Sequence, residues 1–188
     1  MARKIACDIL YQLEIRGDDL EQVLKDFQPM IRDGVEELEL PPGGIPEFSL
    51  ELVRTYLSHQ EEIDGLIEGY SEGWTLPRMP MVDRNLLRLG FTELLYFPDI
   101  PVSVTINEYL ELAKAFSTGD SGRFINGVMA SLVKDRGIAK GEAGEPLPGQ
   151  DDGGQGYDGS LGNGYGEDAG MIGPTGKEEP GEVVEEDR

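Results

Sequence analysis

Apolar residues recur at helical spacing through most of residues 2–136, and the pattern predicts helices throughout with no strand. The clearest example lies between residues 101 and 116, where the positions i, i+3, i+4 and i+7 are Ile106, Tyr109, Leu110 and Ala113. The turn-forming run Ser117-Thr118-Gly119-Asp120 should end this helix, and Asp120 or Ser121 can cap a second one. That second helix is expected to bury Ile125, Val128, Met129 and Leu132.

The same reasoning places five helices before residue 101. The first spans about 2–16 and ends at Gly17, and the next is capped by Asp18 or Asp19 and packs through Leu20, Val23, Leu24 and Phe27. Residues 28–48 contain a Pro-Pro-Gly-Gly run and are predicted to form a surface loop. Two helices share residues 48–70 with a break near 58–62, and another covers about 82–97 and ends at Pro98. The expected fold is all-α, a compact bundle of about seven helices in two antiparallel subbundles.

The helix predicted at 82–97 is apolar on more than one face, which allows two interpretations. It is either the central core helix or a helix that keeps one face for a partner. Gly90 lies inside it, where glycine costs about 1 kcal/mol relative to alanine, so a close approach by another helix is the expected reason.

Charge and glycine divide the chain into two parts, a folded domain over 1–140 and a tail over 141–188. The tail holds 14 of the 26 glycines and 13 acidic residues against 2 basic ones, a net charge of −11. Without an apolar period, such a segment cannot offset the entropy of ordering and is expected to be disordered. The domain itself carries 14 basic and 24 acidic residues, a net charge of −10.

Several function classes lack the residues they require. The single cysteine, Cys7, lies among apolar neighbours and is expected to pack, and the single histidine, His59, has no second histidine or cysteine to complete a metal site and is expected at the surface. The domain has no phosphate-cradling glycine motif and no histidine beside a nucleophile, so we expect no enzyme, cofactor or metal. With no apolar run of about 20 residues and no leader-like start, no membrane contact and a cytoplasmic location are expected.

The corner between the last two helices combines features that suit single-stranded nucleic acid. A helix N-terminus and Arg123 attract phosphate, and aromatic faces such as those of Phe116 and Phe124 stack on unpaired bases. Both rings could instead belong to the core, because each extends an apolar stripe of its helix. The pattern alone leaves the two interpretations open.

At this corner the sequence resembles a known family. INEYLELAKAF followed by SGRFINGVM is similar to the pattern of the NusB family of transcription antitermination factors, and two further blocks, DRNLLRLG with ELL at 83–95 and ARKIACDILYQLEIRG at 2–17, resemble its preceding helices in the same order. In the family the first helix opens with an arginine-rich segment that contacts RNA, of which Arg3 and Lys4 match the last part.

The resemblance implies an RNA-binding adaptor. Together with NusE, a small-subunit ribosomal protein, it would bind the boxA element of ribosomal RNA transcripts and help RNA polymerase, within its antitermination complex, to read through terminators. Arg3, Lys4 and Arg123 would neutralise phosphates, Phe116 and Phe124 would stack on bases, Asn107 and Ser121 would supply hydrogen bonds, and Asp120 would accept from a base amine. The residues expected to face the protein partner are Asp83, Arg84 and Leu87. The alternative is a protein-binding helical adaptor with weak or no RNA binding.

Overall fold

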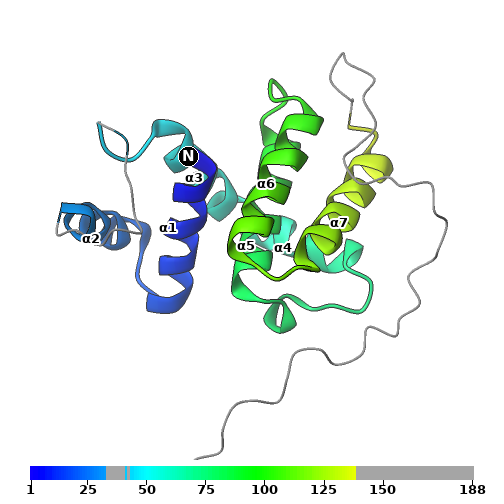
Figure 1. Ribbon diagram of the computed structural model, residues 1–188, viewed down its shortest axis with the longest axis horizontal. Helices are drawn as coiled ribbons and strands as arrows, with labels where there is room; N and C mark the ends of the chain where they lie inside the picture. Colours follow the sequence, from blue (N-terminus) through cyan, green and yellow to red (C-terminus); the bar gives the residue numbers. More distant parts are fainter. Residues whose placement is uncertain (33–40, 42, 139–188) are drawn as a thin grey trace, which may run out of the picture. The chain divides into compact units, whose positions relative to one another are not determined.

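A computed structural model of the protein describes residues 1–32, 41 and 43–138, with the side chains of 27–32 left out. Within these residues the chain forms seven α-helices and one 3-10 turn (Figure 1). They are α1 (Ala2–Arg16), α2 (Leu20–Arg32), α3 (Glu47–Ser58), α4 (Gln60–Tyr70), η1 (Leu76–Arg78), α5 (Met81–Tyr96), α6 (Val102–Phe116) and α7 (Ser121–Arg136). The all-helical fold is confirmed, and no strand occurs in this part of the chain.

The helix ends follow the local signals of the sequence. Gly17 ends α1 in the left-handed conformation, with φ of 65°, and its N–H donates to the carbonyl of Leu13. The Asp19 side chain accepts from the backbone N–H of Gln22 at 2.8 Å and thereby caps α2. The prediction that residues 28–48 form a loop is wrong at both ends, because α2 continues to Arg32 and α3 begins at Glu47. The side chain of Phe27 and the predicted tail at 141–188 lie outside the described residues.

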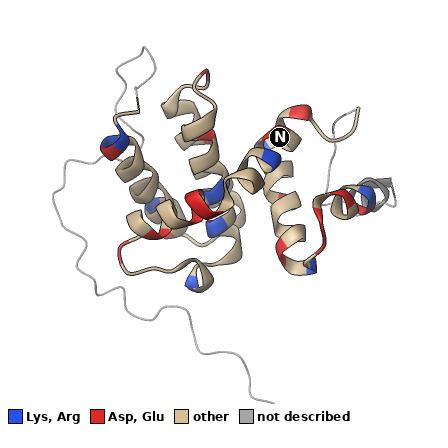
Figure 2. Cartoon of the chain, turned by 180° about the vertical axis from the view of Figure 1, so that it is seen from behind, with Lys and Arg blue, Asp and Glu red and all other residues tan. Residues whose placement is uncertain are grey.

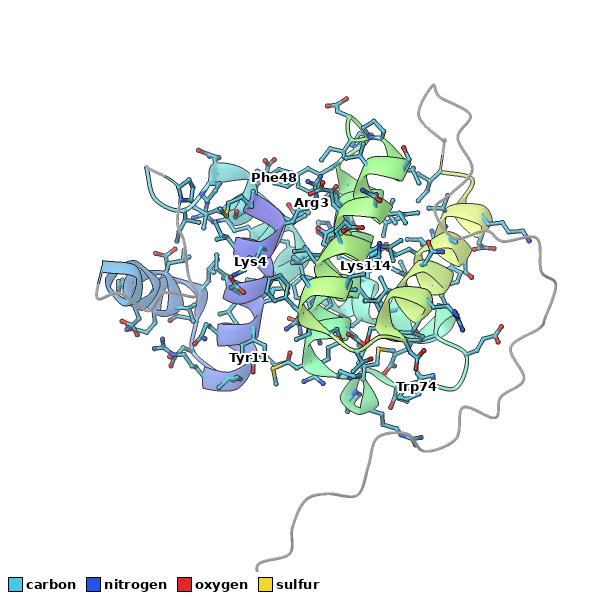
Figure 3. All side chains as sticks on the ribbon, in the orientation of Figure 1. Arg3, Lys4, Tyr11, Phe48, Trp74 and Lys114 are labelled. Carbon is cyan, nitrogen blue, oxygen red and sulfur yellow. The ribbon has the colours of Figure 1, made fainter. Side chains whose placement is uncertain are left out.

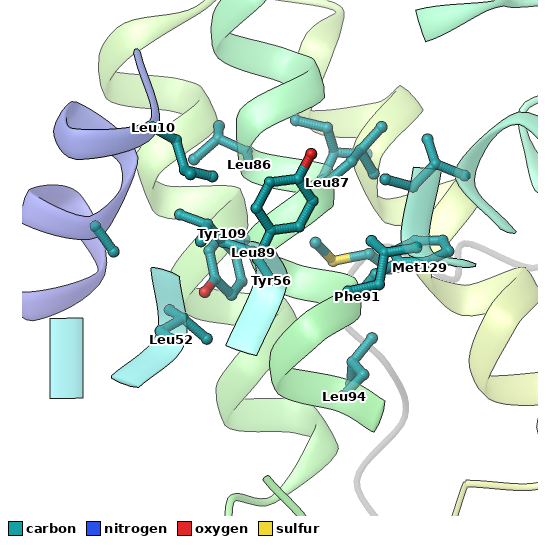
Figure 4. Close-up of a cluster of buried hydrophobic side chains, with 14 of the residues drawn as sticks. Leu10, Leu52, Tyr56, Leu86, Leu87, Leu89, Phe91, Leu94, Tyr109 and Met129 are labelled. Atoms are coloured by element: carbon teal, nitrogen blue, oxygen red, sulfur yellow. The ribbon is translucent and has the colours of Figure 1, made fainter. Parts of the chain in front are cut away.

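The central helix is α5, which packs against α1, α3, α4, α6 and α7. Side chains of α5 form the middle of the apolar cluster in Figure 4, with residues from α1, α3, α6 and α7 around them. Of the two interpretations for this helix, the core is the one realised: every residue from Asn85 to Leu94 except the half-buried Arg88 is buried.

Pairings at the two ends of α5 fix the directions of its neighbours. Glu93 accepts from Thr105 and Tyr109 in the first half of α6, whereas Asp83 accepts from Ser117 just after its end, so α5 and α6 are antiparallel. Ion pairs likewise join both ends of α1 to α5 in the antiparallel sense, through Arg3 with Glu93 and Glu14 with Arg84. The start of α1 and the α6–α7 corner are therefore both held by side chains of α5.

Gly90 permits the close approach that its position predicts. A Cβ atom at Gly90 would lie 1.9 Å from Cε of Met129 and 3.4 Å from Cδ2 of Tyr109. The absent side chain thus lets α7 and α6 pack directly onto α5, which brings the corner between them close to the start of α5.

His59 and Trp74 are both partly buried. His59 separates α3 from α4, and its Nδ1 lies 2.9 Å from the carbonyl of Thr55 while its ring stacks on Tyr96 with centroids 4.2 Å apart. Its prediction as a surface residue is therefore only half right. Trp74 packs against the core, as expected, with its ring centroid 6.1 Å from that of Phe124.

Candidate nucleic-acid interface

Phe116 ends α6 with half of its surface in solvent. The apolar stripe of α6 continues to this residue, and Tyr109 and Ala113 before it are fully buried, yet Phe116 is 52% exposed. It lies at the last position of the helix, and its ring contacts the Lys4 ammonium of α1, whose Nζ is 5.3 Å from the ring centroid. Of the two interpretations of this ring, the exposed one is realised.

Lys4 connects α1 to this ring while keeping its amino group near the surface. Its side chain is 27% exposed, and its Nζ donates to Asp8 at 2.9 Å. Burial raises the pKa of Asp8, and the Lys4 ammonium only partly opposes that rise. A cation above an aromatic face can move to a phosphate when a base stacks on the exposed part of the ring.

Arg3, the neighbour of Lys4, is directed into the protein. Its Nε and Nη2 donate to the two carboxylate oxygens of Glu93 at 2.8 and 2.7 Å, and its guanidinium stacks on Phe48 (Figure 3). Burial alone would lower the pKa of Arg3, but the hydrogen bonds and charge of Glu93 outweigh it and raise the pKa. The prediction that Arg3 neutralises a phosphate is corrected, because its guanidinium already forms an ion pair with the fully buried Glu93.

The hydroxyl of Ser121 is also engaged in a hydrogen bond inside the protein. Ser121 is 2% exposed, and its hydroxyl donates to Asp83 at 2.7 Å. Because that hydrogen is committed, the Thr118 hydroxyl, 2.7 Å away, is the donor in the bond between them. Ser121 therefore holds the corner together and offers RNA no free group.

The other residues predicted around the corner differ in position. Arg123 is exposed in the first turn of α7 and makes no ion pair with any side chain that the structure describes, whereas Phe124 is half-buried beside Trp74. Asp120 is exposed at the start of α7 but makes no capping hydrogen bond, contrary to its predicted capping role. Asn107 is exposed but lies about 14 Å along α6 from Phe116 and half a turn round the helix, so the structure does not bring it to the corner.

Two of the three residues expected to face a protein partner lie inside the bundle, and the third, Arg84, is half-buried. Leu87 is fully buried and Asp83 is 2% exposed. Arg84 donates to Glu14 of α1 at 2.7 Å and to the carbonyl of Met79 at 2.9 Å. Their prediction as a partner surface is corrected, because α5 is covered by other helices of this chain along that stretch.

Tyr11 is a surface residue that the sequence reasoning missed. It is 38% exposed and lies seven residues after Lys4, on the same outward side of α1 (Figure 3). The signal was available, because Tyr11 falls opposite the buried stripe of Ile5 and Ile9. We call Lys4, Tyr11 and Phe116 the α1–α6 face.

Charge around this face is mixed rather than uniformly basic. Acidic and basic residues are interspersed over the described helices (Figure 2), and the whole chain has a net charge of −21. No group of three metal-ligating side chains is found in the part that the structure describes, and none of its helices has the length and apolarity needed to span a bilayer. The arrangement suits base stacking with a few phosphate contacts better than a broad electrostatic footprint.

The helical domain is similar in sequence and in fold to known proteins. Residues 1–134 match the sequence model of the NusB family. The transcription antitermination protein NusB of Desulfitobacterium hafniense is 44% identical over 134 residues, covering 71% of this chain and 86% of that protein. Among solved structures, NusB of T. maritima is 37% identical with a TM-score of 0.60, covering 71% of this chain and 89% of that one. A chain from a crystal structure of the antitermination factors NusB and NusE with double-stranded RNA is 28% identical with a TM-score of 0.59, covering 71% and 94%. The chain belongs to the NusB family.

Proposed function

We propose that this protein is a transcription antitermination factor that binds boxA RNA of ribosomal RNA transcripts together with NusE and promotes read-through by RNA polymerase. Membership of the NusB family supports the role, and a relative of the same fold has been crystallised with NusE and RNA. Such a role belongs in the cytoplasm, where a bacterial transcript is made, and it requires no catalysis by this chain.

The observation that carries the proposal is the half-exposed Phe116 ring with the Lys4 ammonium beside it. Aromatic rings stack on unpaired bases irrespective of sequence, and a neighbouring ammonium neutralises the phosphate of the same nucleotide. Tyr11 extends the ring surface along α1, and Arg123 adds a cation at the start of α7. Phe124 is proposed to support the corner by packing and not to stack on a base, because its half-buried ring lies beside Trp74.

NusE is expected to supply much of the attraction for RNA. A chain with a net charge of −21 repels RNA at long range, and Lys4 and Arg123 provide only two phosphate contacts. We therefore expect the pair of proteins to bind boxA RNA more tightly than this chain alone, with strong weakening as salt rises.

Titration of a fluorescently labelled boxA RNA with the full chain, with and without NusE, tests the proposal. Phe116→Ala should weaken binding by about 5- to 100-fold, the effect of losing one stacked base. Leu57→Ala is the matched control, because Leu57 is a partly exposed apolar residue of α3 and should leave affinity unchanged. Absence of RNA binding at low salt even with NusE would leave only the protein-binding adaptor.

A further inference from the structure

Asp83, in the first turn of α5, is the centre of a buried polar cluster that holds the α6–α7 corner. Its carboxylate is 2% exposed, and both oxygens accept hydrogen bonds, one from Ser117 and the other from Ser121 at 2.7 Å. Thr118 donates to Ser121 at 2.7 Å, so three hydroxyls of the corner are connected to one acid. A carboxylate out of water is retained only with such partners, which makes the set cooperative.

The corner has few other restraints. Its backbone N–H groups donate three hydrogen bonds, from Ser117 to Ala113 at 2.9 Å, from Ser121 to Thr118 at 3.1 Å and from Phe124 to Asp120 at 3.2 Å, all between residues three or four apart in the sequence. Asp120 makes no side-chain capping bond, and Gly119 has open space around it. The orientation of the segment therefore depends on the hydroxyl bonds to Asp83.

The two ends of this corner carry groups assigned to RNA. Phe116 immediately precedes Ser117, and Arg123 follows Ser121 by two residues. Rotation of the corner would move the ring out of reach of Lys4 and swing the first turn of α7. Binding that needs both groups in place is sensitive to such movement, because a disordered site must be ordered before it binds.

We propose that Asp83 is a positioning residue for RNA binding, which orders the α6–α7 corner through Ser117 and Ser121 and does not itself contact RNA or NusE. The inference rests on the proposed function. Direct contact with a partner is disfavoured by burial and by the engagement of both carboxylate oxygens. Ser117 shares the task, and it is more accessible to substitution because it is only half-buried.

The experiment compares Ser117→Ala, Ser117→Thr and Asp83→Asn in the full chain, with labelled boxA RNA and NusE. Ser117→Ala and Asp83→Asn should weaken RNA binding about tenfold, whereas Ser117→Thr keeps the hydroxyl and should bind within about twofold of the unmodified chain. Ser131→Ala is the control, because its exposed hydroxyl bonds only to the carbonyl of Gly127 in α7. Binding to NusE in the absence of RNA should be unchanged in all four variants.

Amide hydrogen exchange separates positioning from general stability. In Ser117→Ala the amides of residues 117–124 should exchange faster while those of the buried Phe91 and Leu132 do not change. RNA affinity equal to that of the unmodified chain in Ser117→Ala would overturn the inference, as would a loss of NusE binding confined to Asp83→Asn. Failure of the unmodified chain to bind RNA with NusE would instead overturn the proposed function, and this inference with it.

Discussion

Arg3→Met should destabilise the helical domain far more than Lys4→Met, although the two residues are neighbours with the same charge. Arg3 makes two hydrogen bonds, of 2.8 and 2.7 Å, to a Glu93 carboxylate that is fully buried. Lys4 pairs with Asp8 across one helical turn, and both of those side chains are 27% exposed. The first substitution leaves a buried charge without its counter-ion, and the second does not.

The expected magnitudes follow from burial. Removing one partner of a buried ion pair costs about 3–5 kcal/mol, and Arg3→Met belongs near the lower end because Glu93 keeps its bonds from Thr105 and Tyr109. The half-buried pair of Lys4 and Asp8 at i and i+4 contributes about 0.3–0.5 kcal/mol, and the contact of the ammonium with the Phe116 ring adds about 0.5 kcal/mol, so Lys4→Met should cost about 1 kcal/mol. The two free energies of unfolding should therefore differ by about 2 kcal/mol.

Urea denaturation followed by far-ultraviolet circular dichroism measures this difference. Combining Arg3→Met with Glu93→Leu should recover part of the loss, since it removes both charges. The assignment of Arg3 to the core would be refuted if Arg3→Met lowered the free energy of unfolding by less than about 1 kcal/mol. It would also be refuted if Arg3→Met and Lys4→Met lowered the free energy of unfolding equally. In RNA titrations the order should reverse for the folded proteins, with Lys4→Met the weaker binder.

Three further predictions concern charge and burial. Burial raises the pKa of Asp8, so ionisation of this carboxyl destabilises the folded state as the pH rises above 3.8. Asp8→Asn should therefore be at least as stable as the unmodified chain in thermal melting at pH 7, and it should bind RNA up to about fivefold more tightly. Weaker RNA binding by Asp8→Asn would contradict the prediction. Burial also raises the pKa of Cys7 to about 12, so its alkylation by iodoacetamide at pH 8 should be slow in the native protein and fast in urea; equal rates would refute it. Removing residues 141–188 changes the net charge from −21 to −10 and should strengthen RNA binding at low salt but not at high salt; equal affinity at every salt concentration would mean that the tail is simply solvated.

Helices and their packing faces were predictable because they depend on local spacing. Ile106, Tyr109 and Ala113 recur at the helical period and are all fully buried, and Gly17 ends α1 as its position suggests. Gly90 was predictable for the same reason, since a glycine inside an apolar helix indicates a close neighbour. Such signals need no knowledge of which helices meet.

Phe116 shows where local spacing stops being informative. Phe116 and Ala113 both lie on the apolar stripe of α6, so the helical period favours burial of both side chains about equally. A side chain is buried, however, only where another part of the protein packs against it. α6 ends at Phe116, and the group opposite the ring is the ammonium of Lys4, more than a hundred residues earlier in the chain. Exposure at a helix end is decided by tertiary packing, which the helical period does not contain.

The errors at Arg3, Asp83 and Ser121 share one cause, namely that a charged or hydroxyl side chain is expected in solvent unless its distant partner is known. Arg3 meets Glu93 ninety residues away, and Asp83 meets Ser121 thirty-eight residues away. A signal was nevertheless present in α5. Asp83 is in register with Leu87, Gly90 and Leu94 at i+4, i+7 and i+11, so this acid lies on an apolar stripe of the helix. An acid on a buried stripe must find donors, and donors on other helices must then lie opposite it. Because those donors lie in the α6–α7 corner, the buried acid also determines how the exposed ring of Phe116 is presented.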